Sequence, residues 1–212
     1  MNYSVALLSV SGLYACDVGM GIVGKLHPSE VLVFPEPRSG VLTQNGLADL
    51  ELASKAHILL DRELALRSES KSYVTTFPAA MSVALCGQFA DEVGGADASM
   101  PTRLALMRIQ STIAHLMVLT DIFSYSGVYY LPIEDPDEKQ AVLQGYIKLA
   151  LSQCEISYRT IDPAPAKDVA SLIVSRIEEA AGKLQETDEA KDTNAKDGHQ
   201  ISDGRGTSPT GG

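Results

Sequence analysis

The sequence predicts an α+β fold, mainly α, with a small N-terminal antiparallel β-layer followed by about five helices around a central buried helix. Short apolar, β-branched runs joined by Gly and Pro fill residues 2–45, which indicates the β-layer. From Asn45 the apolar period changes from two to 3.6, which indicates helices. Residues 101–127 are apolar on nearly every face, as is typical of a helix inside a domain.

The predicted β-layer consists of short segments. Residues 2–15 fit one strand, or two strands broken at Gly12. Residues 31–34 (VLVF) are a second candidate that ends at Pro35, because proline cannot donate a ladder hydrogen bond. Residues 41–43 are a third, and tight Gly/Pro turns join all of them into an antiparallel layer.

The apolar run at 5–15 permits a second interpretation. It ends in Leu-Tyr-Ala-Cys, which resembles a bacterial lipoprotein cleavage box with Cys16 as the anchored residue. The preceding MNYS contains no Lys or Arg, whereas a signal peptide has a positive n-region. The three cysteines form no CxxC pair and fit a reducing compartment. We therefore predict a buried strand in a cytoplasmic protein.

Apolar periodicity and start signals predict the helices. Their expected ranges are 46–70, 78–93, 101–127, 135–158 and 166–185. The clearest start is Asp135-Pro136, an N-cap followed by proline at the first helical position. The central helix has only 12 residues without a charge, from Ile109 to Thr120, and a membrane span needs about 20. No transmembrane segment is expected.

Residues 186–212 are polar, with six acids against Lys191, Lys196 and Arg205, and this composition predicts a disordered acidic tail. We expect residues 1–185 to form one domain, β-rich over 1–45 and helical over 46–185.

Charge and motif content exclude several chemistries. The net charge is −10 and the basic residues are scattered, which disfavours direct binding to nucleic acid. None of the four histidines has a spacing typical of a zinc site. We identify no catalytic residue, no metal site and no cofactor.

A glycine cluster satisfies two phosphate-binding patterns, GxGxxG and GxxxxGK. Its members are Gly19, Gly21, Gly24 and Lys25. A P-loop continues with Ser or Thr, but residue 26 is Leu. The next strand candidate begins near Val31, which leaves no room for the helix that both nucleotide-binding motifs require. A Gly-rich hairpin turn or bulge is the favoured interpretation, and phosphate binding is the alternative.

Four aromatic residues cluster where the predicted central helix ends: Phe123, Tyr125, Tyr129 and Tyr130. They would either fill the core or form an anchor patch for another subunit. We predict a non-enzymatic structural, assembly or protein–protein interaction protein that self-associates or joins a complex. The alternative is a nucleotide- or phosphate-binding protein, possibly an enzyme, that uses the glycine loop 19–25.

Overall fold

The computed structural model describes residues 2–26, 30–33, 47–93, 100–122 and 125–197. The elements in chain order are β1 (Ser4–Leu8), α1 (Gly12–Leu26), β2 (Glu30–Leu32), α2 (Leu47–Ser68), β3 (Tyr73–Thr75), α3 (Ala79–Val93), α4 (Met100–Ile122), β4 (Gly127–Tyr130), α5 (Glu138–Gln153), β5 (Arg159–Thr160) and α6 (Ala166–Asp197). The chain divides into two compact units, Met1–Ile177 and Glu178–Gly212. Among the described helices, none combines the length and the apolar character that a membrane crossing requires.

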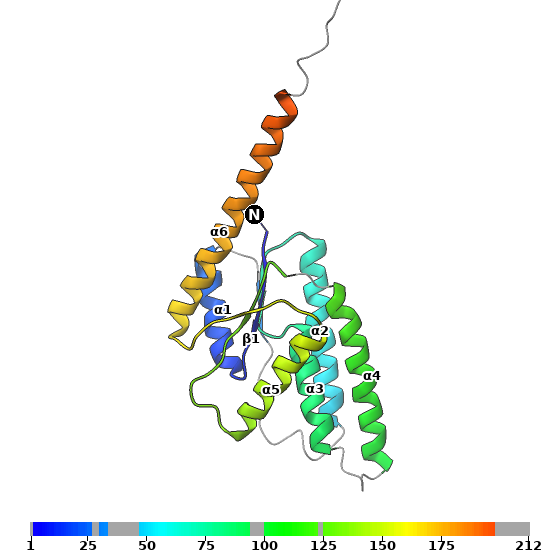
Figure 1. Cartoon of the computed structure of the whole chain (residues 1–212). Helices are drawn as coiled ribbons and strands as arrows, with labels where there is room; N and C mark the ends of the chain where they lie inside the picture. Colours follow the sequence, from blue (N-terminus) through cyan, green and yellow to red (C-terminus); the bar gives the residue numbers. More distant parts are fainter. Residues whose placement is uncertain (1, 27–29, 34–46, 94–99, 123–124, 198–212) are drawn as a thin grey trace, which may run out of the picture. The chain divides into compact units, whose positions relative to one another are not determined.

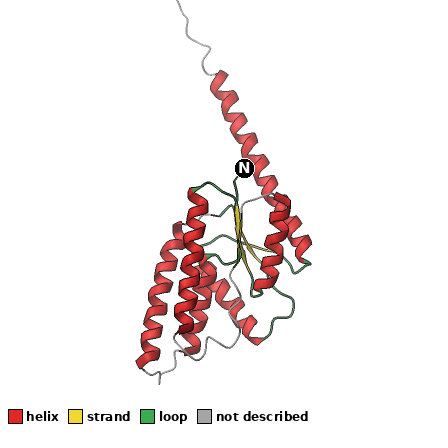
Figure 2. Ribbon diagram, turned by 180° about the vertical axis from the view of Figure 1, so that it is seen from behind, coloured by secondary structure: helices red, strands yellow, loops and turns green. Residues whose placement is uncertain are grey.

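The five strands form one parallel sheet in the order β2-β3-β1-β4-β5. The predicted antiparallel β-layer at the N-terminus is therefore wrong, because the strands are spread along the chain as far as Thr160. Parallel neighbours need a crossover connection, so helices separate the strands and cover both faces of the sheet (Figure 2). The protein has a doubly wound α/β fold rather than an α+β fold with helices around one another.

Strand β1 lies at the centre of this sheet (Figure 1). Its residues Val5 to Leu8 are completely buried. Val5 and Leu7 belong to the core on one face, and Ala6 and Leu8 belong to the core on the other. Cleavage before Cys16 would remove this strand, so the lipoprotein interpretation does not fit the fold. Of the strand or strands predicted over 2–15, only Ser4–Leu8 is a strand, and Gly12 begins helix α1.

The glycine cluster lies within helix α1, so the predicted hairpin turn or bulge is wrong. A buried stripe of Ala15, Val18 and Ile22 holds the helix on the sheet. A Cβ at Gly19 would lie 3.3 Å from a methyl group of Val31. Glycine costs about 1 kcal/mol in a helix interior, but here it permits the close approach of α1 to its neighbours.

Helix α4 does not lie at the centre of the fold, so the predicted central role of 101–127 is also wrong. The helix packs on α3 and faces outward in both overall views (Figures 1 and 2). Met100, Met107 and Val118 are each more than 60% exposed on its outer side (70%, 65% and 63%). The apolar character that indicated burial therefore continues onto a face that the described residues leave open.

Helix α5 begins two positions later than the Asp135-Pro136 signal predicts. Its N-cap is Asp137, which accepts a hydrogen bond from the Gln140 amide at 2.8 Å, while the Gln140 side chain accepts from the Asp137 amide at 3.0 Å. This capping box satisfies two otherwise unpaired donors. The helix also ends early, and β5, which the sequence did not predict, follows it.

Helix α6 extends through Asp197, so residues 186–197 of the predicted tail are helical. Residues 198–212 lie outside the described part of the chain. The division into a domain at 1–185 and a disordered tail remains a prediction.

Candidate functional site

The strand order creates a switch point at the carboxyl end of β1. The chain leaves β1 into α1, which shares a core with α6 on one face of the sheet. It leaves the neighbouring β4 toward α5, which shares a core with α3 on the opposite face. In open α/β sheets, ligands bind outside the carboxyl ends of the strands at such a point.

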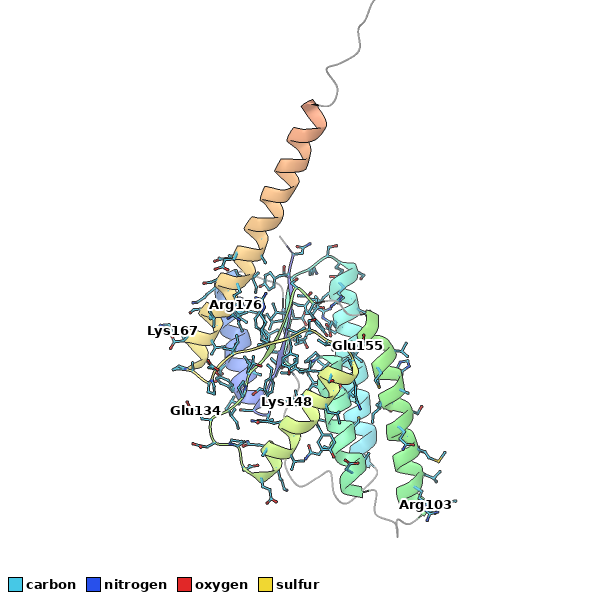
Figure 3. All side chains as sticks on the ribbon, in the orientation of Figure 1. Arg103, Glu134, Lys148, Glu155, Lys167 and Arg176 are labelled. Atoms are coloured by element: carbon cyan, nitrogen blue, oxygen red, sulfur yellow. The ribbon has the colours of Figure 1, made fainter. Side chains whose placement is uncertain are left out.

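A cavity of about 430 Å³ opens beside this switch point. Its lining comes from the start of α1 and from the segments that follow β4 and β5: Tyr14, Pro132, Ile133, Glu134, Pro163, Ala164 and Pro165. The walls are mostly apolar, and Glu134, which lies on the segment after β4 (Figure 3), adds one carboxylate. The Tyr14 hydroxyl donates a hydrogen bond to the Ala164 carbonyl at 2.6 Å, which links α1 to the segment before α6.

The N-terminus of α1 lies next to this cavity through Tyr14. The Tyr14 amide donates to the Ser11 hydroxyl oxygen at 3.2 Å, so Ser11 caps the helix. The Ser11 amide in turn donates to the hydroxyl oxygen of buried Ser9, also at 3.2 Å. The first turn contains no acidic residue. The positive end of the helix dipole is therefore not neutralised by a carboxylate of its own helix.

The structure does not bring the predicted phosphate-binding residues to this edge. Gly19, Gly21, Gly24 and Lys25 lie in the interior and last turn of α1, not in a loop. Amides at such positions bond to carbonyls of the preceding turn and cannot cradle a phosphate. The Lys25 ammonium donates to the Ser171 hydroxyl of α6, roughly 20 Å along the helix from Ser11.

The aromatic cluster fills the core. Tyr129 and Tyr130 are 3% and 2% exposed, and they pack into opposite faces of the sheet. Tyr125 packs against the core beside α2, and Phe123 lies outside the described residues. Of the two interpretations that the sequence allowed, core packing accounts for the three described tyrosines, and the anchor-patch hypothesis has no support from them.

Sequence reasoning missed the residues that line the cavity. The prolines of the cavity wall indicated only the end of a strand and the start of a helix, and neither signal points to a binding site. The signal that remained in the sequence was a polar Ser-Val-Ser segment directly after the most apolar strand. Its meaning depends on knowing that β1 lies between β3 and β4.

A buried acidic residue, Glu63, lies away from the cavity on α2. It is 1% exposed and accepts a hydrogen bond from the Tyr73 hydroxyl at 2.8 Å. Arg67 donates from Nε to the same tyrosine oxygen at 2.6 Å, and its charge lies 3.9 Å from the Glu63 carboxylate. Burial raises the pKa of Glu63, while the hydrogen bond from Tyr73 and the Arg67 charge lower it in part. Since Tyr73 begins β3, the cluster stabilises the amino edge of the sheet, opposite the cavity.

We expect Glu63→Gln to remove a pH dependence of stability. A raised folded-state pKa means that the folded chain holds a proton that the unfolded chain has released, so stability falls as pH rises through the folded pKa. Gln stays neutral and keeps the acceptor for Tyr73. Urea unfolding between about pH 4 and 7 should show the unsubstituted protein losing stability relative to the variant as pH rises.

Glu69→Gln serves as the control, because the hydrogen bond with Lys71 lowers the pKa of the exposed Glu69. The Glu69→Gln variant should not become more stable than the unsubstituted protein as pH rises. A constant difference between Glu63→Gln and the unsubstituted protein across the pH series would contradict the raised pKa.

Comparison with known proteins shows similarity of fold alone. No family model matches the chain, and no curated protein matches its sequence. Among solved structures, it is similar to a deoxyadenosine kinase from M. mycoides with the products dCMP and a flexible dCDP bound. The TM-score is 0.46 at 13% identity, and the match covers 84% of this chain and 99% of that chain. We transfer no residue and no activity from that kinase.

The predicted function as a non-enzymatic, self-associating structural protein is wrong. It was based on a helical body around residues 101–127 with a tyrosine patch at its end. The chain has instead a doubly wound parallel sheet, and its described tyrosines from this cluster pack into the core. The glycines of the alternative, phosphate-binding interpretation lie inside helix α1.

Proposed function

We propose that the protein binds a nucleotide, or another small molecule with a phosphate group, at the carboxyl edge of its sheet. The observation that carries this proposal is the cavity of about 430 Å³ beside the capped start of α1 at the switch point. Small-molecule sites commonly measure about 300–1,000 Å³, and parallel sheets bind ligands at this edge.

The phosphate group would lie at the start of α1. A helix N-terminus combines first-turn amides with the positive end of the dipole, and this first turn has no acid to compete. The Ser11 oxygen accepts from the Tyr14 amide, so its hydroxyl proton can still be donated to a phosphate oxygen.

The apolar part of the ligand would occupy the cavity itself. Proline and isoleucine side chains of 132–133 and 163–165 provide flat apolar walls for a ring system. Tyr14 adds an aromatic face, and the Glu134 carboxylate can accept hydrogen bonds from amino groups.

Isothermal titration and thermal unfolding with ATP, GTP, pyrophosphate and adenosine test the proposal. A nucleotide should bind more tightly than the nucleoside without phosphates, since only the nucleotide engages the helix start. At 100 times Kd, a ligand adds about 2.7 kcal/mol to the stability of the folded state. No shift with any of these compounds at millimolar concentration would contradict nucleotide binding.

Two substitutions at Ser11 separate charge from folding. Asp and Asn both cap helices well, so each variant should fold like the unsubstituted protein. Ser11→Asp puts a negative charge where the phosphate would lie and should weaken nucleotide binding at least about tenfold, or 1.4 kcal/mol. Ser11→Asn should retain most of the affinity. Equal affinities for the two variants would argue against a phosphate at the start of α1.

Lys25→Ala distinguishes this site from the glycine motif. Because Lys25 bonds to Ser171 at the other end of α1, its removal should leave nucleotide affinity unchanged. Loss of affinity would instead favour the glycine segment as the binding site.

We also propose that the protein acts in the cytoplasm. Cys16, Cys86 and Cys154 form no disulfide, which fits a reducing compartment.

A further inference from the structure

The outer face of α4 carries a regular row of exposed positions. They recur at alternating intervals of four and three residues: Met100, Leu104, Met107, Ser111, Ala114 and Val118. We call this row the α4 seam. Ile113 and Met117 pack against the core, so the fold already uses an adjoining side of the helix.

The spacing of the α4 seam is that of a coiled coil. Intervals of four and three residues give the heptad period, which keeps apolar side chains in line along a helix for contact with a second helix. Four of the six side chains are large and apolar, and they are 51–70% exposed. Ser111 and Ala114 separate Met107 from Val118, and exposed large apolar side chains lined up along one helix are typical of an interaction surface.

We infer that the α4 seam docks an amphipathic helix of another protein, with acidic residues beside its apolar stripe. Helix α4 contains two arginines, Arg103 and Arg108, and one acidic residue, Asp121 near its end, in a chain whose net charge is −10. Both arginines are exposed and flank the seam, and Figure 3 shows Arg103 near the start of α4. Residues at flanking heptad positions select the charge of a partner helix.

The same charges disfavour pairing with a second copy of the chain. An antiparallel pair centred on the seam would bring Arg108 against Arg108 of the other copy, since equivalent flanking positions face each other. A parallel pair would bring Arg103 against Arg108 of the other copy, because these positions are five residues apart. Like charges oppose both arrangements, whereas a partner with Glu or Asp at its flanking positions would be attracted.

A pair of synthetic peptides tests this inference on the full chain. Each has about three heptads with Leu at the a and d positions, and they differ only in carrying Glu or Lys at the flanking positions. By fluorescence anisotropy, the Glu peptide should bind at least about tenfold more tightly than the Lys peptide. Arg108→Glu should reverse this preference, a result that a general apolar contact would not produce.

Variants locate the binding on the α4 seam. Leu104→Asp combined with Met107→Asp should weaken binding of the Glu peptide at least tenfold. Leu149→Asp, which changes an equally exposed leucine on α5, should leave binding unchanged. Circular dichroism confirms that each variant folds. Binding of neither peptide, or equal binding of both, would overturn the inference.

Sedimentation of the protein without peptide tests whether a second copy of the chain occupies the α4 seam. We expect a monomer at tens of micromolar. A dimer that dissociates when Leu104 and Met107 are replaced would identify a second copy as the occupant and overturn the proposed acidic partner. Neither experiment depends on nucleotide binding in the cavity, which no residue of α4 lines, so the two proposals fail separately.

Discussion

Replacing Gly21 with Ala should destabilise the protein by about 1–3 kcal/mol, whereas Gly24→Ala in the same helix should stabilise it by about 0.5–1 kcal/mol. A Cβ at position 21 would lie 2.7 Å from the Cβ of Ala170, a distance at which one helix must move. A Cβ at position 24 would meet no atom within 4 Å. Alanine has a higher helix propensity than glycine, so Gly24→Ala gains stability. At Gly21 the steric clash with Ala170 costs more than this gain.

Chemical denaturation of the two variants measures this contrast. The two positions share helix, residue type and substitution, so only their surroundings differ. If both replacements stabilise the protein, α1 and α6 do not approach as closely as described. If both destabilise it, the space beside Gly24 is occupied.

Leu7→Asp should prevent folding. Leu7 is completely buried in the central strand, and an unpaired buried charge costs more than the 5–15 kcal/mol by which domains of this size are usually stable, unless it is neutralised. Val118→Asp provides the matched control, because it places the same charge on α4 at a position that is 63% exposed.

Circular dichroism and the soluble yield of the two variants decide between β1 and α4 as the centre of the fold. The control should keep a cooperative unfolding transition, and Leu7→Asp should show none. A folded Leu7→Asp together with an unfolded Val118→Asp would restore the sequence-based prediction of a central helix at 101–127.

Apolar periodicity predicted the helices that have ordinary helical composition. The range 78–93 agrees with α3, and 46–70 agrees with α2 within two residues. Helix α1 was not predicted because four glycines lower its intrinsic helix preference. Two of them, Gly19 and Gly21, are explained by contacts with β2, β3 and α6. Those contacts join residues far apart in sequence, which no local pattern records.

The sheet and the candidate site could not be predicted from the sequence for a related reason. Strands β2 and β3 have three residues each and β5 has two, too few to establish a period. Hydrophobic runs also do not indicate whether neighbours are parallel. The cavity depends directly on strand order, since its walls follow β1, β4 and β5, so it could not be found before the order was known.

The central position of β1 also sets when this domain can fold during synthesis. Contacts of the β1 segment with the β3 segment span 69 residues, and those with the β4 segment span 122. Because β1 precedes both partner strands in the chain, its apolar residues must wait, unpaired, until the β4 segment has also been synthesised. Loop closure over such distances is slow, and an exposed apolar strand is prone to aggregate. We expect chaperones that bind nascent chains to protect residues 4–8, and the yield of folded protein to depend on the speed of translation.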